Sequence, residues 1–238
     1  MKVSTAALRW FGVPNAEEHT ARLVRGSEIR TAVDIGCGTS SHLTRFRPRL
    51  VTVGVDAFEG AVEASRAAGA HDHYRVIDML HDEVEPVLEP FGGELCDLVT
   101  LYGVVEHFTK AEGLKLLERC ERLTSKYILV ETPNGFVAQG PEYGNERQRH
   151  LSGWFAHDFE GLGYSVYGTT GTKLLRGYNA DLKSTLRGAM TLDVLLSYAL
   201  RIERRPQHAF NLLAIKDVRG VPPRLGARRS GQEKLSCR

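Results

Sequence analysis

Short apolar runs alternate with polar or amphipathic stretches through most of the chain. The runs have the length of strands, and the stretches between them carry apolar residues at helical spacing. The predicted strands cover residues 31–34, 50–55, 73–77, 97–101, 127–130, 164–168 and 208–215. The predicted helices cover residues 15–26, 40–47, 61–68, 82–88, 110–123, 155–162 and 192–202. This alternation predicts a parallel sheet covered by helices on both faces.

Length and composition are those of an ordinary globular protein. The chain has 238 residues, of which 42% are hydrophobic and 25% are charged, and this is enough for one α/β domain with a substantial core. We expect a single domain over residues 1–218, in which residues 171–206 form an inserted helical cap. Residues 219–238 are basic and rich in Pro and Gly, and we expect them to be a solvated, mobile tail.

Net charge, cysteine spacing and the N-terminal sequence indicate which partners and which cellular compartment to expect. The formal net charge of +2 is too small to indicate a nucleic-acid partner by itself, although the basic tail leaves contact with RNA or anionic lipid open. The four cysteines show no metal-binding spacing and are interpreted as reduced and structural. Residues 1–9 lack the pattern of a signal peptide, and no stretch approaches membrane-spanning length. A cytoplasmic enzyme is the expectation.

The segment from Thr31 to Gly38 joins an apolar strand to a tight turn. Gly36 and Gly38 remove the Cβ atoms that would keep the backbone away from a ligand. The dinucleotide fingerprint G-x-G-x-x-G needs a third glycine where Ser41 stands, which weakens a nicotinamide or flavin interpretation. The turn is therefore built for close approach to a ligand, but it departs from the usual dinucleotide site.

Three of the predicted strands end in an aspartate, namely Asp34, Asp56 and Asp78. The carboxyl ends of strands in an open parallel sheet border one crevice, so we expect these acids to converge there. The separation of Asp56 from Asp34 is close to the spacing of about 20 residues at which such folds place a ribose-binding acid. Asp56 is therefore expected to accept both ribose hydroxyls. The alternative is an acid that caps the following helix.

Asp34-Ile-Gly36-Cys-Gly38 resembles motif I of the class I S-adenosylmethionine (SAM) dependent methyltransferases. The resemblance extends over about residues 31–135. It implies a Rossmann-like fold with a seven-stranded, mostly parallel sheet, an antiparallel last strand and a helical insertion between strands six and seven. It also implies SAM as the cofactor and S-adenosylhomocysteine (SAH) as the product. The residues implied in cofactor binding are Asp34, Gly36, Cys37, Gly38, His42, Asp56, Ala57, Asp78, Met79, Tyr102 and Gly103.

The resemblance gives several of these positions a specific partner on SAM. Asp78 resembles the residue that accepts a hydrogen bond from the adenine amino group, and Met79 is expected to pack on the adenine face. The amides of residues 39–42 would meet the carboxylate of the methionine moiety. They lie at the start of the predicted helix 40–47, and a helix N-terminus attracts anions.

Residues 102–108 resemble the family segment that lines the sulfonium end of SAM. Methyl transfer is an in-line displacement, so the enzyme has to align the acceptor and to deprotonate it if it is a hydroxyl. Glu106 and His107 are the catalytic candidates, and the alternative for this pair is a helix cap with a packed ring. Some ubiquinone-pathway O-methyltransferases have Glu-x-x-Glu-His here and bind a divalent metal. Gly103 stands where the first Glu would be, so no metal is expected.

Residues 131–136 and 150–158 resemble segments of small-molecule and glycan-associated members of the family. In those members the histidine leads into the helix before strand six, so His150 is a second candidate base. The alternative is a capping or loop histidine. Trp154 and Phe155 are expected to belong to the core.

The predicted cap over residues 171–206 is a candidate acceptor-binding element. Lys173, Arg176 and Arg187 are suited to bind a phosphate or carboxylate on the acceptor. The spacing of Leu192, Leu195, Leu196 and Ala199 gives an amphipathic helix face, which is expected to pack. This face could instead bind a lipid-linked acceptor or form a homodimer.

The sequence thus predicts a SAM-dependent methyltransferase acting on an O or N nucleophile of a small molecule, such as a secondary metabolite, sugar or lipid precursor. A nucleic-acid acceptor is less favoured, because Leu101-Tyr102-Gly103-Val104 stands where an Asn-Pro-Pro-Tyr type motif would follow strand four. An rRNA or tRNA acceptor stays open through the basic tail. The sequence also leaves open an NAD(P)-binding oxidoreductase and a non-catalytic SAM-binding partner of another methyltransferase.

Overall fold

The computed structural model describes residues 15–26, 29–47, 49–141, 145–177, 181–183 and 188–220. The predicted tail therefore lies outside the described residues from residue 221 onwards, as does Arg187 in the predicted cap. No helix within the described ranges is long and apolar enough to cross a membrane.

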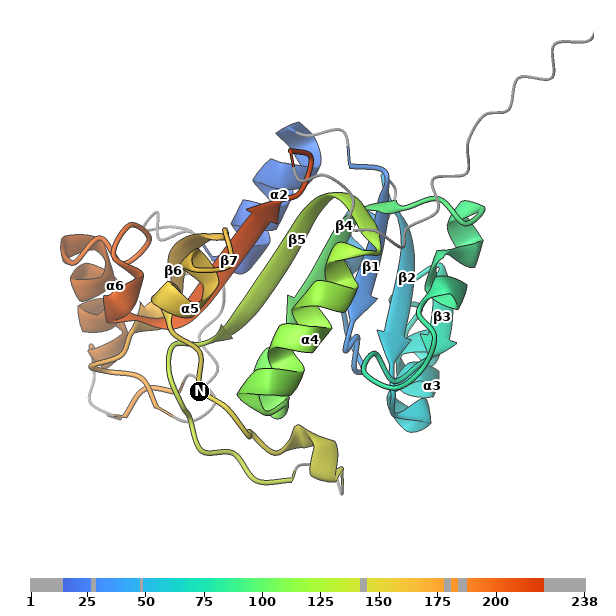
Figure 1. Cartoon of the computed structure of the whole chain (residues 1–238). Helices are drawn as coiled ribbons and strands as arrows, with labels where there is room; N and C mark the ends of the chain where they lie inside the picture. Colours follow the sequence, from blue (N-terminus) through green and yellow to red (C-terminus); the bar gives the residue numbers. More distant parts are fainter. Residues whose placement is uncertain are drawn as a thin grey trace, which may run out of the picture.

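A seven-stranded sheet with the order β3-β2-β1-β4-β5-β7-β6 forms the centre of the structure (Figure 1). Neighbouring strands from β3 to β5 are parallel, whereas β7 is antiparallel to both β5 and β6. The strands are β1 Thr31–Ile35, β2 Val51–Asp56, β3 His73–Val76, β4 Cys96–Tyr102, β5 Thr124–Pro133, β6 Ser165–Thr172 and β7 Ala209–Asp217. The predicted Rossmann-like sheet with its antiparallel last strand is confirmed.

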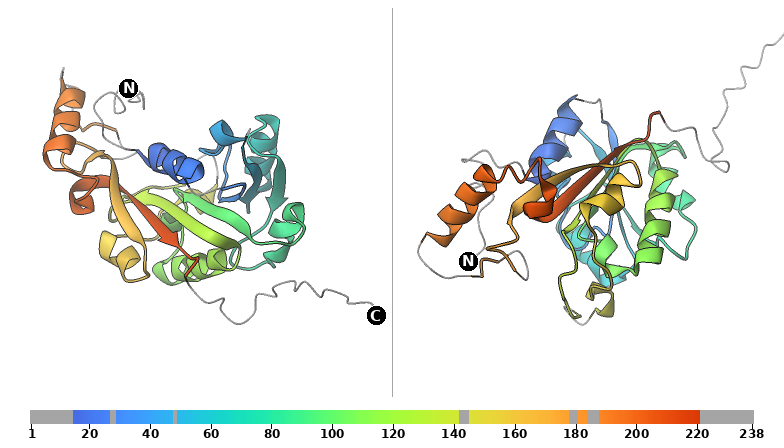
Figure 2. Two further views of the ribbon diagram at one scale, coloured as in Figure 1. Left: turned by 90° about the horizontal axis from the view of Figure 1, so that it is seen from above. Right: turned by 60° about the vertical axis from the view of Figure 1, so that its left-hand side comes forward.

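Helices cover both faces of this sheet. Figure 2 shows α4 and α5 over one face and α2 over the other. The two faces correspond to two buried clusters, one containing Leu116 and Phe159 from α4 and α5, and one containing Ala21 and Val24 from α2. The α-helices are α2 Ala16–Gly26, α3 Glu59–Ala67, α4 Lys110–Glu121, α5 Ala156–Glu160 and α6 Ala189–Ala199.

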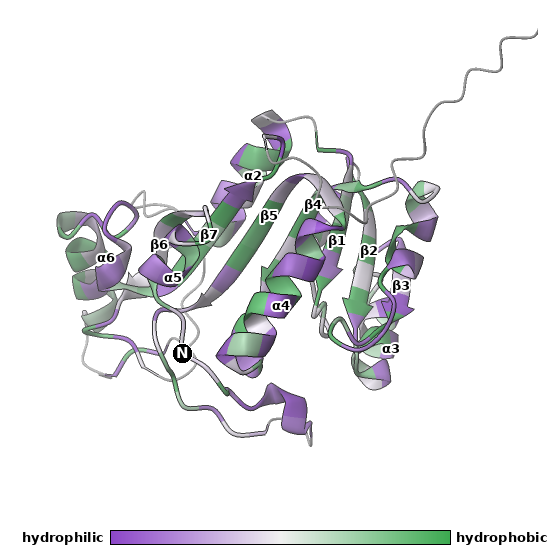
Figure 3. Cartoon of the chain, in the orientation of Figure 1, coloured by the Kyte–Doolittle hydropathy of each residue, from purple (hydrophilic) through white to green (hydrophobic). Residues whose placement is uncertain are grey.

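Local sequence signals fix the ends of several helices. Asn15 Oδ1 accepts a hydrogen bond from the Glu18 amide at 2.9 Å, which is the N-cap expected before α2. Thr109 and Glu112 form a capping box at the start of α4. In Figure 3, α4 carries both hydrophilic and hydrophobic residues along its length. Its buried residues include Leu117, whereas Leu114 is 41% exposed.

Two predicted helices are 3-10 turns instead. The segment 40–47 contains only η1 Thr44–Phe46, and the segment 82–88 overlaps η2 Glu85–Phe91. In the first segment the Ser41 hydroxyl accepts from the Leu43 amide and donates to Asp34 Oδ2. Such side-chain bonds to the backbone compete with a helix. The expected helix N-terminus at residues 39–42 is therefore absent.

The predicted cap contains α6, but its apolar face does not pack as expected. Leu192 and Leu195 are 49% and 55% exposed. The opposite side of the helix is buried because Asp193 Oδ1 accepts from the Thr172 amide at 2.8 Å and Oδ2 accepts from Arg176 Nε at 2.7 Å. A buried polar anchor on β6, and not the leucine spacing, sets the orientation of α6.

Candidate active site

The glycine turn after β1 has the backbone conformation that its sequence predicts. Gly36 has φ +66°, and a Cβ there would lie 2.6 Å from Val104 Cγ2. Gly38 has φ +53°, with no atom closer than 4.0 Å to the position of a Cβ. The space beside Gly38 is thus open to a ligand, whereas Gly36 is needed for packing of the turn against the segment after β4.

Asp56 lies at the end of β2 directly beside this turn. Its Oδ2 accepts a hydrogen bond from the Gly38 amide at 3.1 Å, and its Oδ1 accepts from the Phe58 amide at 2.9 Å. The carboxylate is partly exposed, so each oxygen keeps a lone pair for a further donor. This geometry fits a ribose whose hydroxyls donate to Asp56 next to the exposed backbone of Gly38. Ala57 follows immediately in the same turn.

The side chains of Asp34 and Cys37 are buried in the protein behind the glycine turn. Asp34 is 3% exposed, and it accepts from Thr100 Oγ1 at 2.7 Å as well as from Ser41 Oγ. Cys37 is 2% exposed, and burial raises the pKa of its thiol to about 12. Because both side chains are enclosed by the protein, direct cofactor contacts in this turn are left to backbone groups.

Asp78 follows β3 and is engaged by a residue from a distant loop. Arg147 Nη1 donates to Asp78 Oδ2 at 2.8 Å, and the Leu80 amide donates to Oδ1 at 3.0 Å. Burial opposes ionisation, but these hydrogen bonds outweigh it and lower the pKa of Asp78 to about 2. The neighbouring Met79 side chain is 5% exposed and packs in the core. An adenine contact by its side chain would need that packing to change.

The segment after β4 connects the glycine turn to a cavity. Gly103 has φ +65°. The Tyr102 ring lies 4.3 Å from the His42 ring, centroid to centroid, and Tyr102 Oη is 2.6 Å from Thr20 Oγ1. His42 is therefore held on Tyr102 at the cavity wall. It does not lie at a helix N-terminus as predicted.

The cavity beyond Gly103 has a volume of about 370 Å³. Six of the predicted site residues line it, and they come from the segments around residues 42, 102–107 and 150. Its full lining is His42, Tyr102, Gly103, Glu106, His107, Glu131, Thr132, Pro133, Val137, Gln139, Gln148, His150, Phe210 and Asn211. Glu131 and Asn211 were missed from the sequence, although Glu131 lies near the end of β5, where the strand-end rule places site residues.

Two carboxyl groups line this cavity, of which Glu106 is buried and Glu131 is half-buried. Burial raises the pKa of Glu106 to about 7, although its Oε2 accepts a hydrogen bond from Thr132 Oγ1 at 2.9 Å. Burial also raises the pKa of Glu131, whose Oε1 accepts from Thr169 Oγ1 at 3.1 Å. Carboxyl groups with raised pKa values are suited to hold or exchange a proton near neutral pH.

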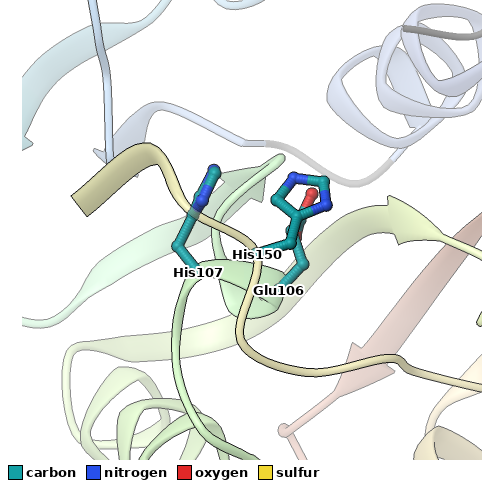
Figure 4. Close-up of side chains that lie close together, drawn as sticks. All are labelled: Glu106, His107 and His150. Atoms are coloured by element: carbon teal, nitrogen blue, oxygen red, sulfur yellow. The ribbon is translucent and has the colours of Figure 1, made fainter. Parts of the chain in front are cut away.

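His107 and His150 lie close to Glu106. Figure 4 shows the three side chains extending in a similar direction from two segments of the chain. The two rings are 4.9 Å apart, centroid to centroid. Burial and the neighbouring His150 lower the pKa of His107, so the His107 ring is neutral at pH 7. A neutral imidazole can accept a proton from an acceptor hydroxyl.

The basic residues of the cap contribute little to this cavity. Arg176 is 3% exposed and forms an ion pair with Asp193, so its predicted role in binding an acceptor is not supported by its position. Lys173 Nζ lies 5.7 Å from the centre of the Phe155 ring. Trp154 is fully buried as expected, whereas Phe155 is 45% exposed and is not a core residue.

Comparisons with known proteins give a methyltransferase-like fold. Residues 33–127 match the family model of a methyltransferase domain. The plantazolicin methyltransferase BpumL, in complex with SAH and a pentazolic desmethylPZN analog, is similar in structure with a TM-score of 0.51 and 17% identity. The match covers 90% of this chain and 86% of that one. No curated protein matches the sequence.

Two further solved structures are similar to parts of this chain. The small RNA methyltransferase HEN1 matches with a TM-score of 0.50 and 15% identity, over 84% of this chain but only 24% of that one. Magnesium protoporphyrin IX methyltransferase from Synechocystis PCC 6803, with bound SAM, matches with a TM-score of 0.49 and 14% identity, over 84% of this chain and 77% of that one.

The sheet order, the turn that Gly38 and Asp56 build and the family match together support a SAM-dependent methyltransferase. Residues 33–127 of the chain are similar to a methyltransferase domain, in agreement with the resemblance to class I methyltransferases that the sequence indicated. This similarity supports SAM as the cofactor over the oxidoreductase alternative.

Proposed function

We propose that the enzyme methylates an oxygen or nitrogen nucleophile of a small molecule bound in the cavity beyond Gly103. The observation that carries this proposal is the cavity itself. Its volume of about 370 Å³ is in the range of small-ligand sites. It joins Gly103, on the SAM side, to His107 and His150.

His107 and His150 are the proposed bases in this reaction. SAM supplies an electrophilic methyl group when it is bound, and the protein has to orient the acceptor and remove its proton. Because the pKa of His107 is lowered, its ring is unprotonated and competent at neutral pH. Glu131 and Asn211 also line the cavity and offer an acceptor and a donor that can orient polar groups of the substrate.

The test is SAH formation from SAM in the presence of pooled phenols, sugars, hydroxy acids and amines, with the product identified by mass spectrometry. We expect SAH to form with one chemical class of acceptor only, and the acceptor to gain one methyl group. His107→Gln and His150→Gln should lower kcat while SAM binding by calorimetry is kept.

If SAM binds but no pool is methylated, and RNA is methylated instead, the small-molecule proposal is wrong. If SAM binds and nothing is methylated, the partner-subunit alternative gains support. Function in the cytoplasm stays a prediction from the sequence.

A further inference from the structure

We propose that Glu106, His107 and His150 bind a divalent cation of the first transition row at the wall of the cavity. One ligand atom from each of these residues lies within 4.8 Å of the others. Ligands about 2.1 Å from one ion lie at most about 4.2 Å apart, so small side-chain movements close the site. The sequence led to the opposite expectation, because Gly103 replaces a carboxylate. The structure supplies a third ligand from a loop more than 40 residues away.

The backbone around these side chains is connected. Glu106 and His107 lie on the 3-10 turn η3 Val105–His107. The Leu151 and Ser152 amides both donate to the Glu106 carbonyl oxygen, at 2.8 and 3.1 Å. The loop that carries His150 is therefore attached to the turn that carries the other two ligands. Such attachment holds a metal site together before the ion binds.

The two imidazoles have the orientation that metal-binding histidines usually have. His107 Nδ1 lies 3.3 Å from the Arg149 carbonyl oxygen, and His150 Nδ1 lies 2.7 Å from the Val137 carbonyl oxygen. A carbonyl oxygen only accepts, so Nδ1 carries the hydrogen in both rings. The neutral tautomer then has its lone pair on Nε2. A ring N–H donated to a backbone carbonyl is the common support of a metal-binding histidine.

Glu106 supplies a buried carboxylate for the ion. It is 4% exposed, and its Oε2 accepts from the neutral hydroxyl of Thr132 at 2.9 Å. No lysine or arginine forms an ion pair with Glu106 in the part of the chain that the structure describes. A buried carboxylate is stabilised when it is paired with a positive charge or coordinates a metal.

The donor set selects the class of ion. Two imidazole nitrogens and one carboxylate favour Zn²⁺, Fe²⁺, Co²⁺ or Mn²⁺ over Mg²⁺ and Ca²⁺, which prefer all-oxygen sites. Three protein ligands leave positions open on the ion, and these positions face the cavity. An ion there would bind an acceptor oxygen and lower the pKa of that group. With their Nε2 lone pairs on the ion, His107 and His150 would then act as ligands and not as the bases themselves. This last step rests on the proposed function, whereas metal binding does not.

The test is equilibrium dialysis of metal-stripped, tag-free protein against Co²⁺, with the visible d–d absorption of the bound ion as a second readout. We expect one Co²⁺ per chain, displaced by Zn²⁺ and not by equimolar Mg²⁺. Glu106→Gln and His150→Gln should each weaken Co²⁺ binding by about 100-fold or more. The matched control is His73→Gln, because His73 is exposed at the start of β3, and it should bind as the unmodified protein does.

Equal Co²⁺ binding by His150→Gln and His73→Gln would overturn the proposal, and so would no Co²⁺ binding by the unmodified protein. SAH calorimetry and thermal unfolding show whether each variant is folded. If the buried Glu106→Gln variant does not fold, His150→Gln, which changes a loop residue, decides the question. The measurement uses neither SAM nor an acceptor, so a failure of the small-molecule proposal does not affect it.

Discussion

Arg147 Nη1 lies 2.8 Å from Asp78 Oδ2, and this ion pair joins residues separated by 69 positions. It places the loop between β5 and α5 against the end of β3. The family resemblance assigns Asp78 to the adenine of SAM. On that assignment, Arg147 and the cofactor would compete for one carboxylate.

We expect Arg147→Ala to tighten SAH binding by about 2- to 5-fold, because the pair no longer has to break. Arg147 is 59% exposed, and pairs at such exposure contribute less than about 1 kcal/mol. Calorimetry measures the change. Arg149→Ala is the control, since Arg149 pairs with Glu146 in the same loop. Weaker binding by Arg147→Ala would instead make Arg147 part of the cofactor site.

Asp56→Ala should weaken SAM and SAH binding by roughly 10- to 100-fold, because on the predicted cofactor site it removes a charged acceptor of two ribose hydroxyls. It also removes the partner of the Gly38 amide. Asp97→Asn is a useful control because Asp97 lies near the start of β4, where it accepts from the Arg30 amide. Unchanged SAH affinity of Asp56→Ala in calorimetry would show that the ribose is held elsewhere.

The fold was largely predictable from the sequence, whereas the acceptor side of the site was not. Strand ends and the glycine turn follow from local patterns, so the turn at Gly36 and Gly38 and the position of Asp56 beside it could be predicted, whereas their role in cofactor binding stays a prediction. The exposure of Leu192 could not be predicted, because it depends on the buried Asp193–Arg176 pair. The contact of His150 with His107 likewise depends on how a long loop folds back.

Substitution of Gly113 should destabilise the protein through the loop that carries His150. A Cβ at Gly113 would lie 2.5 Å from Trp154 Cζ2, and Trp154 Nε1 donates to the Val105 carbonyl at 3.2 Å. We expect Gly113→Ala to cost about 1–3 kcal/mol and to shift tryptophan fluorescence in urea titrations. Gly140→Ala is the control, because no atom lies within 4 Å of its Cβ position. Equal stability of both variants would mean that Trp154 moves without cost.

Stability should fall as the pH is lowered from about 6.5 to about 4, in part because of His19. Burial, with a smaller effect of Arg22, lowers the pKa of His19 to about 4. The unfolded chain therefore takes up a proton in this range that the folded chain does not bind, which favours unfolding. Glu203 Oε1, 3.4 Å from His19 Nε2, offsets part of the effect.

We expect His19→Gln to reduce the loss of stability between pH 7 and pH 4 by about 1–3 kcal/mol. Urea denaturation at the two pH values gives the difference. Because other groups titrate in the same range, the comparison is between the two proteins and not between the two pH values alone. An identical pH dependence of the two proteins would show that His19 takes up its proton over the same pH range in the folded and the unfolded chain.

The antiparallel pairing of β7 with β5 brings Phe210 and Asn211, from near the end of the chain, to the cavity. The cofactor turn is built from β1 and β2, so the two halves of the site come from separate stretches of sequence. The family match over residues 33–127 includes the first half and stops before Glu131. On the proposed function, acceptor selectivity can therefore be changed at cavity residues beyond the family match, such as Glu131, Gln148 and Asn211, while the turn at Gly38 and Asp56 is left untouched.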